Sequence, residues 1–521
     1  DHRDLHSFPT RRSSDLIQIS FHPIEERFEV YNTAIQKDKS WLPDISKILG
    51  AQCNIYNVVE DYSKDNPNVE KQIIFEKIQN LQAILNKQVG LIELDNDLDI
   101  DVVTEIFIRI NSKGVVLSQA DFVMSKIASN ESYGGNLLRK CIDYFCHLSI
   151  APGFYYHIVE VDKEFCETDY FPKISWLKNE NDDLYDPDYT DLIRVAFTSE
   201  FNRGRLSDLV NLLSGRNFEE RIFQEEIAEN SYAILKRGVY NFINETKFKN
   251  FVMIIKSAGF IDKSLINSQN ALNFSYILYL KLRSKNINPS LIESYVRKWF
   301  VLSYITSRYS GSPESKFDSD VKNINNRNFE EFLQDIEDAE LSDAFWLSGL
   351  PQQLSSSNNN SPSFNTYLAA QSKLNYNGFL SKDITINHLI QHKGDIHHLF
   401  PKDYLKKNGF SKSQYNQVAN YVYMQTEVNI KIGNRSPIEY FSLLKEQCNN
   451  GNPEFGGITD YDFLLKNLSD NDIPIEIIEM TSDNYMEFLE KRRMLLAQKI
   501  KLYYKRDRKS TRLNSSHTDI S

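Results

Sequence analysis

Cysteine is scarce in this sequence: its 521 residues include five cysteines, an odd number, and no two of them form a CxxC pair. This pattern excludes a disulfide framework and a thiolate zinc site, and it suits a reducing compartment. No run of about 18 apolar residues is present, so we expect no membrane span. No charged segment followed by an apolar segment opens the chain, so we expect no secretion. The prediction is a cytoplasmic protein that makes no membrane contact.

An excess of basic charge is also lacking, because 60 Lys and Arg stand against 71 Asp and Glu and the net charge is −11. This excludes a generally basic surface that coats nucleic acid by counterion release. It does not exclude a nucleic-acid enzyme, which needs basic residues only where the phosphates lie. The 28 Tyr and 32 Phe supply ample material for large cores. The length predicts two to four globular domains.

Both ends of the chain differ in character from what lies between them. Residues 1–16 and 509–521 are polar and non-periodic, and they resemble translated sequencing-adapter read-through. The alternative is a pair of disordered tails. We leave these segments out of the fold argument. On the adapter interpretation, the natural protein begins further upstream and its N-terminus is missing here.

Helical periodicity dominates the remaining chain, which predicts an α+β fold that is mostly helical. Asn68–Asn86 and Asp101–Ile110 carry apolar residues at helical spacing, and Ser118 is expected to cap the next helix. We expect a partial N-terminal domain over 17–135 and a helical region over 136–350. The helical region should contain helices at 191–198, 206–213, 218–235 and 273–282. Residues 351–364 have the composition of a linker, and a compact domain at 365–508 should end in an amphipathic helix at 480–504.

Chemistry-bearing side chains gather in the compact C-terminal segment, at His397, His398, Asn420 and Asn429. Phosphodiester hydrolysis needs a base for the attacking water, a divalent cation, and a group that orients the base. A neutral imidazole suits the base, because its unperturbed pKa is about 6.5. Neighbouring strand residues point to opposite faces. At the end of a twisted hairpin, one histidine can therefore face a metal and the other the water.

This stretch resembles the motif of ββα-metal (HNH-type) nucleases. In that family a metal ligand and a His stand side by side, an Asn follows, and a final His or Asn comes nine positions later on a helix, as Asn429 follows Asn420 here. The resemblance implies that His397 and Asn429 are metal ligands, that His398 is the general base and that Asn420 orients it. Lys431 stands where the family often has a basic residue facing the phosphate.

Two positions depart from the family pattern. His397 stands where many members have Asp, and the last ligand, Asn429, is not His. An amide is a weaker ligand than imidazole but a hard oxygen donor, so we expect Mg²⁺ or Mn²⁺ as the cofactor.

Simpler interpretations accompany each of these residues. A His-His pair alone is more often structural, but Pro401, Asn420 and Asn429 at matching spacing favour the nuclease. His388 and His392 lie four apart and could share a helix face that suits zinc, yet no second ligand pair accompanies them, so we favour a structural role. Lys402 is predicted to contact substrate phosphate. It belongs to a group that is either a phosphate-contacting patch or a solvated face: Lys402, Lys406, Lys407 and Lys412.

A second resemblance begins upstream, in the stretch Ile106-Phe-Ile-Arg-Ile-Asn-Ser-Lys-Gly-Val-Val-Leu-Ser. It continues at Phe201-Asn-Arg-Gly-Arg, at Leu212-Leu-Ser-Gly-Arg and at Asp395-Ile-His-His-Leu-Phe-Pro-Lys. These stretches are similar to GmrSD-type, modification-dependent restriction enzymes, which pair a ParB/sulfiredoxin-like N-terminal domain with an HNH-type C-terminal domain. The Asp-Gly-Gln-Gln-Arg nucleotide motif of that family is absent here.

The GmrSD resemblance implies a nucleoside triphosphate as a further cofactor of the full-length protein. It also implies that Arg109 and Asn111 position nucleotide or DNA, whereas the simpler interpretation of these residues and Gly114 is a helix end followed by a turn. The resulting expectation is a metal-dependent DNA endonuclease that acts in defence against base-modified phage DNA. An RNA-cleaving toxin and a catalytically silent nucleic-acid-binding protein remain as alternatives, and the oligomeric state stays open.

Overall fold

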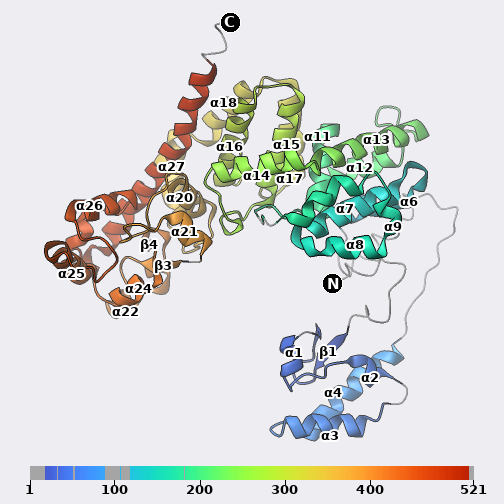
Figure 1. Cartoon of the computed structure of the whole chain (residues 1–521), viewed down its shortest axis with the longest axis horizontal. Helices are drawn as coiled ribbons and strands as arrows, with labels where there is room; N and C mark the ends of the chain where they lie inside the picture. Colours follow the sequence, from blue (N-terminus) through green and yellow to red (C-terminus); the bar gives the residue numbers. More distant parts are fainter. Residues whose placement is uncertain are drawn as a thin grey trace. The chain divides into compact units, whose positions relative to one another are not determined.

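The computed structural model describes residues 18–31, 33–50, 53–87, 106, 118–180, 182, 184–392 and 394–515 (Figure 1). The chain divides into two compact units, residues 1–99 and residues 100–521. Helices predominate, and the strands of the described residues form two antiparallel pairs. The expected class, α+β and mostly helical, is therefore confirmed. Across the described ranges, no helix has both the length and the apolar character that a membrane span requires.

The smaller unit is a hairpin packed with short helices. Strands β1 and β2 pair from Ile19↔Val30 to His22↔Arg27. The predicted periodicity of Asn68–Asn86 is observed in α4, whose Ile74, Ile78 and Leu81 are buried. The elements of this unit are β1 (Ile19–His22), β2 (Arg27–Val30), α1 (Thr33–Lys37), α2 (Ile45–Leu49), α3 (Ile55–Asp65), α4 (Lys71–Ala83) and η2 (Ile84–Asn86).

The larger unit opens with a helical region that forms one continuous apolar core. Its centre is the antiparallel set α11, α13, α15 and α16, and α15 and α16 are buried on most of their faces. The elements are α6 (Gln119–Ser129), η3 (Glu131–Tyr133), α7 (Gly135–Ile150), η4 (Pro152–Phe154), α8 (Tyr155–Val161), α9 (Lys163–Cys166), α10 (Phe171–Ile174), η5 (Ser175–Asn179), α11 (Tyr189–Phe201), α12 (Leu206–Leu213), α13 (Glu225–Phe242), α14 (Glu245–Ser257), η6 (Lys263–Leu265), α15 (Gln269–Ser284), α16 (Pro289–Ile305), α17 (Pro313–Asn326), α18 (Phe329–Glu340), the π-helical turn η7 (Phe345–Gly349) and α19 (Leu350–Gln353).

The cap predicted at Ser118 is present. Its side chain accepts from the backbone N–H of Asp121, whose carboxylate accepts from Ser118 in return, a capping box that fixes the start of α6. Ala120 and Val123 of α6 are buried in the core of the helical region. The residues of α6, which lie within the predicted segment 17–135, thus pack with the helical region.

The C-terminal elements surround a second core, which draws on residues from Phe379 to Leu489. They are α20 (Pro362–Lys373), α21 (Ile386–Gln391), β3 (Asp395–His398), α22 (Lys402–Lys407), α23 (Lys412–Tyr415), η8 (Val418–Asn420), β4 (Tyr421–Met424), α24 (Thr426–Ile432), α25 (Pro437–Asn450), α26 (Tyr461–Asp470), η9 (Ile475–Glu479), η10 (Ser482–Asn484) and α27 (Tyr485–Ser515). Helix α27 runs from this core back along α20, α16 and α19 (Figure 1). Phe488 lies in the second core and Ile500 in the first, so α27 joins them.

The segment predicted as a linker, residues 351–364, is held in place along its length. It contains the end of α19 and the start of α20. The carbonyl of Ser356 accepts from the backbone N–H of Val418 at 2.9 Å, and Asn360 accepts from Asn267 of the helical region. The Ser- and Asn-rich composition also supplies turn hydrogen bonds, such as that from the Asn358 N–H to Oγ of Ser356.

Candidate functional site

The C-terminal elements β3, β4 and α24 form a strand–strand–helix arrangement. The two strands pair antiparallel, with His397 opposite Val422 and His398 opposite Tyr421. Helix α24 begins two residues after β4 and packs against β3. Because successive strand residues alternate faces, His397 and His398 point in opposite directions. The strand pair thus gives the two histidines different surroundings, as the sequence argument requires.

His397 is buried and faces α24. Its Nδ1 lies 2.5 Å from Oδ1 of Asn429, and its ring stacks on that of Phe379 with 6.5 Å between centroids. These two residues are 32 positions apart in the chain. The structure therefore brings together the two side chains that the sequence predicted as metal ligands.

The His397–Asn429 pair fits a hard divalent cation as a two-ligand site. The amide oxygen of Asn429 is a hard donor that suits Mg²⁺ or Mn²⁺, the imidazole nitrogen of His397 is a softer donor, and Mg²⁺ commonly keeps several waters while taking few protein ligands. In this structure Oδ1 can only accept, so the short contact requires a proton on Nδ1. Cation binding at Nδ1 would replace that proton. Nowhere in the described ranges do three or more His, Cys, Asp or Glu side chains come together to hold a metal.

His398 is half-buried and has a neutral hydrogen-bond partner. Its Nε2 lies 3.0 Å from Oδ1 of Asn416, and the ring of Tyr421 packs edge-on at 4.9 Å. Burial lowers the pKa of His398, the positive charge of Lys402 lowers it further, and the bond to Asn416 opposes both. Since Oδ1 of Asn416 accepts, Nε2 carries the proton and Nδ1 keeps a lone pair. The contact with Asn416 thus favours the neutral tautomer of His398 that carries its proton on Nε2.

Asn420 does not contact His398. It is fully buried, its Nδ2 donates to the carbonyls of Phe400 and Tyr415, and its Oδ1 accepts from the Phe400 N–H at 2.9 Å. The side chain that hydrogen-bonds the ring of His398 is Asn416, so the predicted orienting role of Asn420 is not seen as a direct contact. Asn420 instead fixes the backbone two residues after His398. Sequence reasoning missed Asn416, although its position in the loop before Asn420 makes it a candidate.

The two lysines predicted to face phosphate are placed differently. Lys402, at the start of α22, is close enough to His398 to lower the pKa of that imidazole, and its Nζ lies 6.0 Å from the ring centre of Tyr415. Lys431 donates to the carbonyl of Glu454 at 2.9 Å. It lies two positions after Asn429 on α24, so the two side chains do not share a face. Lys402 joins the site, whereas Lys431 lines a neighbouring groove of about 380 Å³.

A buried arginine supports the site from behind, and no sequence pattern predicted it. Arg492 of α27 is fully buried and donates through Nη1 to the carbonyl of Ala419 at 2.8 Å. It also donates to the carbonyls of Asn471 and Asp472. Ala419 directly precedes Asn420 in η8, so Arg492 holds the turn that carries Asn420.

Other predicted residues lie apart from this site or outside the described ranges. His388 and His392 stack with 4.0 Å between ring centroids, and Nδ1 of His392 lies 3.0 Å from the His388 carbonyl. No further His, Cys, Asp or Glu completes a metal set around them in the described part of the chain. Arg109 and Asn111 fall outside the described residues, as does Gly114.

Comparison with known proteins gives one distant relative and no family. A 217-residue stretch is 26% identical to the uncharacterized protein MJ0686 of Methanocaldococcus jannaschii. The match covers 39% of this chain and 36% of the archaeal protein. The chain thus spans about a third of the length of that relative. No family model matches the chain, and no solved structure matches it.

Proposed function

We propose that this chain is a metal-dependent DNA endonuclease whose β3–β4–α24 segment hydrolyses the phosphodiester bond. The observation that carries the proposal is the pairing of two different histidine environments on one strand. His397 meets Asn429 at 2.5 Å on the helix side, and His398 meets Asn416 at 3.0 Å on the other. Each contact involves a side-chain amide rather than a carboxylate. This arrangement keeps one imidazole neutral for proton transfer and offers the other to a cation.

In this proposal His398 takes the proton of the attacking water at Nδ1, while Asn416 holds its Nε2–H. The lowered pKa of His398 keeps that nitrogen unprotonated at neutral pH. Lys402 supplies positive charge beside the base, where the phosphate would lie. His397 and Asn429 would hold Mg²⁺ or Mn²⁺, which stabilises negative charge on the phosphate when it is bound.

The wider proposal is a GmrSD-type enzyme that acts in the cytoplasm on base-modified phage DNA. Its support is the sequence resemblance, which spans the C-terminal motif and the helical region. A ParB/sulfiredoxin-like N-terminal part would then regulate cleavage, with a nucleoside triphosphate as its ligand in the full-length protein. The relative from Methanocaldococcus jannaschii carries no assigned activity that bears on this choice.

The deciding experiment is nicking of supercoiled plasmid and of modified phage DNA by the purified chain with Mg²⁺ or Mn²⁺. We expect metal-dependent nicking that His398→Ala lowers by at least about 10²-fold, the lower end of what a general base contributes. His388→Ala is the matched control, since it removes an exposed histidine outside the site. Equal nicking by wild type and His398→Ala would overturn the proposal. RNA of the same length tests the toxin alternative.

The metal assignment has its own readout in the same assay. We expect Asn429→Ala to raise the Mg²⁺ concentration needed for half-maximal nicking by about 10- to 100-fold, the range found when support of a metal site is lost. Asn434→Ala, five positions on and outside the site, should leave the titration unchanged. An unchanged requirement in Asn429→Ala would remove that residue from the metal site.

A further inference from the structure

A group of cations gathers on the helical region, at the ends of α11, α14 and α15 and along α13. The residues are Arg237, Lys247, Lys281, Arg283 and Lys285. Arg237 is paired with Glu200 of α11, and the charge of the same carboxylate acts on Lys247 and Lys281. We call these five residues the helical cation cluster. It lies outside the strand–strand–helix site, and the nuclease chemistry proposed above makes no use of it.

Close helix packing brings these cations together. A Cβ on Gly238 would lie 2.6 Å from the carbonyl of Ala196, so glycine at that position lets α13 approach α11 closely. That approach allows Arg237 and Asn241 of α13 to bond the two oxygens of Glu200, each at 2.7 Å. The contacts of Glu200 are thus directed to α13, and neither Lys247 nor Lys281 is paired with its carboxylate.

The two half-buried lysines of the cluster have amide partners. Nζ of Lys281 donates to Oδ1 of Asn202 at 2.6 Å, and Nζ of Lys247 donates to Oδ1 of Asn241. Asn202 ends α11 in a left-handed conformation with φ of 55°, which Asn tolerates better than most residues. Within the described ranges neither lysine forms an ion pair with a carboxylate. Their positive charge is therefore left uncompensated by direct contact.

The remaining cations extend this charge into solvent. Arg283 and Lys285 are exposed at the end of α15, and Nζ of Lys285 donates to the carbonyls of Ile324 and Asn325 rather than to a carboxylate. Burial lowers the pKa of Lys247 and of Lys281. Arg283 lowers that of Lys247 further and Lys285 that of Lys281, while Glu200 opposes both shifts. A bound anion would likewise favour the charged form of both lysines.

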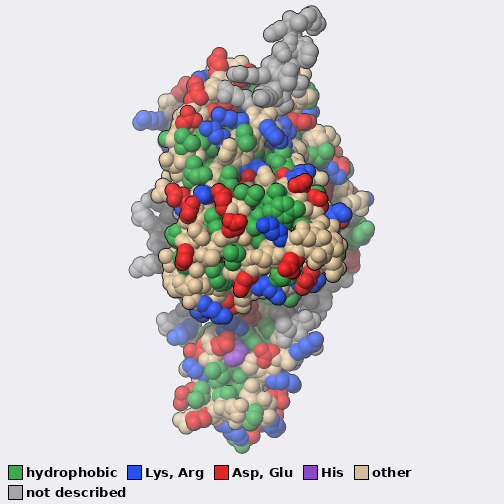
Figure 2. All heavy atoms as spheres, turned by 90° about the vertical axis from the view of Figure 1, so that its left-hand side faces the viewer, with side chains coloured by type: hydrophobic (Ala, Val, Ile, Leu, Met, Phe, Trp, Pro, Cys, Tyr) green, Lys and Arg blue, Asp and Glu red, His purple; other side chains and the backbone are tan. Residues whose placement is uncertain are grey.

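The face around the C-terminal elements carries charges of both signs. Figure 2 shows Lys and Arg interspersed with Asp and Glu over the side that it draws, on which α25 and α26 lie. A protein with a net charge of −11 holds DNA only if its cations gather locally. The helical cation cluster is such a local gathering.

We propose that the helical cation cluster binds the phosphate backbone of nucleic acid, as a second contact away from the cleavage site. Lys247 and Lys281 are its half-buried members, and Arg237, Arg283 and Lys285 are its exposed members. The ligand chemistry is a row of phosphates, and the choice of duplex DNA over a free nucleotide rests on the proposed function. Asn202 belongs to the Phe201-Asn-Arg-Gly-Arg stretch, so the proposal also assigns a role to that motif.

The test measures binding of a fluorescein-labelled 30-base-pair duplex to the full chain by anisotropy, in EDTA, across a series of salt concentrations. We expect Lys247→Gln/Lys281→Gln to weaken binding roughly tenfold and to reduce the slope of log K against log salt by about 2, one for each phosphate contact. Lys249→Gln is the matched control. It lies two positions from Lys247 on α14, but its charge is paired with Glu180 and Glu245.

An unchanged slope in the double variant, or an equal loss in Lys249→Gln, would overturn the proposal. Binding of ATP or inorganic phosphate to the chain, together with no binding of the duplex, would overturn the assignment to nucleic acid. Because cleavage cannot proceed in EDTA, this result is independent of the nuclease. A chain that binds through the cluster but never nicks DNA refutes the proposed function alone. A chain that nicks DNA while the double variant binds normally refutes this inference alone.

Discussion

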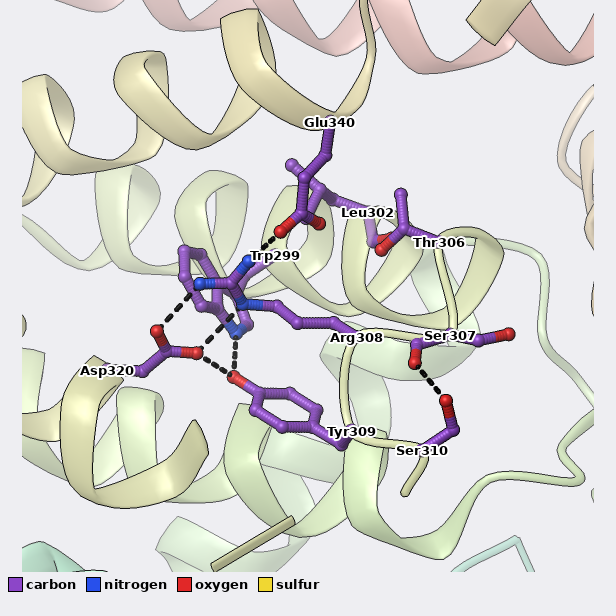
Figure 3. Close-up of polar contacts among 9 residues, drawn as sticks. All are labelled: Trp299, Leu302, Thr306, Ser307, Arg308, Tyr309, Ser310, Asp320 and Glu340. Atoms are coloured by element: carbon purple, nitrogen blue, oxygen red, sulfur yellow. Dashed lines mark hydrogen bonds and ion pairs between the residues drawn. The ribbon is translucent and has the colours of Figure 1, made fainter. Parts of the chain in front are cut away.

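Two buried polar networks in the larger unit satisfy their charges in opposite ways. Between α16, α17 and α18, the guanidinium of Arg308 bonds both oxygens of Asp320, at 2.7 and 2.8 Å, and also bonds Glu340 (Figure 3). The hydroxyl of Tyr309 donates to the same aspartate and accepts from Trp299. In this network the cation is matched by anions.

The histidine site has no such closure. His397 and His398 each contact a neutral amide, and the charge that lowers the pKa of His398 is that of a cation, Lys402. A closed ion network holds helices in register, whereas an imidazole with a neutral partner stays free to exchange protons or to bind a cation. The comparison teaches that burial of polar groups alone does not mark a site. What separates the two regions is the kind of partner each group has.

The largest expected effect breaks the closed network. We expect Arg308→Met to lower the free energy of unfolding by about 3–5 kcal/mol, because Asp320 would remain buried without its counter-charge. Nicking per folded molecule should be unchanged. Urea denaturation followed by circular dichroism measures the first quantity. Lys322→Met, which removes an exposed pair with Asp318, should cost under about 1 kcal/mol. Equal losses of unfolding free energy in the two variants would contradict the contrast between the closed network and an exposed ion pair.

A smaller effect should separate two asparagines within the histidine site. Asn420→Ala leaves one backbone N–H and two carbonyls without their partner, so we expect it to lower stability by about 1–3 kcal/mol and to reduce nicking as well. Asn416→Ala should change stability by less than about 1 kcal/mol, since Asn416 contacts His398 from the loop. It should nonetheless lower kcat about 10- to 100-fold, part of the contribution of a general base.

Unfolding curves and nicking rates of both variants test this division. The reverse pattern, with Asn416→Ala unstable and Asn420→Ala stable but inactive, would return the orienting role to Asn420. Asn416→Asp is the rescue variant, because it keeps an acceptor oxygen at the same place. Recovery of kcat in Asn416→Asp would identify the hydrogen bond, rather than the bulk of the side chain, as the source of the effect.

The parts of this site that depend on local spacing were predictable from the sequence. His397 and His398 adjoin on one strand, and Asn429 on α24 lies at the motif's spacing of nine from Asn420, so the motif predicted the pairing of His397 and Asn429 that the structure shows. Arg492 lies 73 positions from the carbonyl that it supports, and only tertiary packing reveals that contact. The family motif points to Asn420 and not to Asn416. The two residues are of the same type and differ in what they contact, which the sequence does not reveal.

The helical region shows the same limit of sequence patterns. The prediction of a helix at 206–213 matches α12, and the prediction at 191–198 lies inside α11. The helix expected from residue 218 begins only at Glu225. A backbone bridge between Arg216 and Phe223, with Arg221 at φ of 59°, forms a turn there, although its apolar residues imitate helical spacing.

The smallest expected effect is a displacement of the pH profile. Burial lowers the pKa of His398, so the base stays neutral below its ordinary value, and the acidic limb of kcat should have its midpoint below about 6.5. Asn416→Asp places a negative charge beside Nε2, which favours the imidazolium and should move that midpoint upward. Nicking rates from pH 5 to 8 measure both positions.

Stability follows the same titration with a definite sign. The unfolded chain protonates His398 at about 6.5, whereas the folded chain takes up that proton only at lower pH. The contribution of His398 to the free energy of unfolding is thus complete above about 6.5 and is lost as the pH falls through the lowered pKa. In Asn416→Asp the folded pKa rises, so this loss should diminish or change sign. If the pH profiles of kcat and of the free energy of unfolding shift together between the wild type and Asn416→Asp, one group governs both. A shift in only one of the two profiles would show that the catalytic base is not the buried histidine.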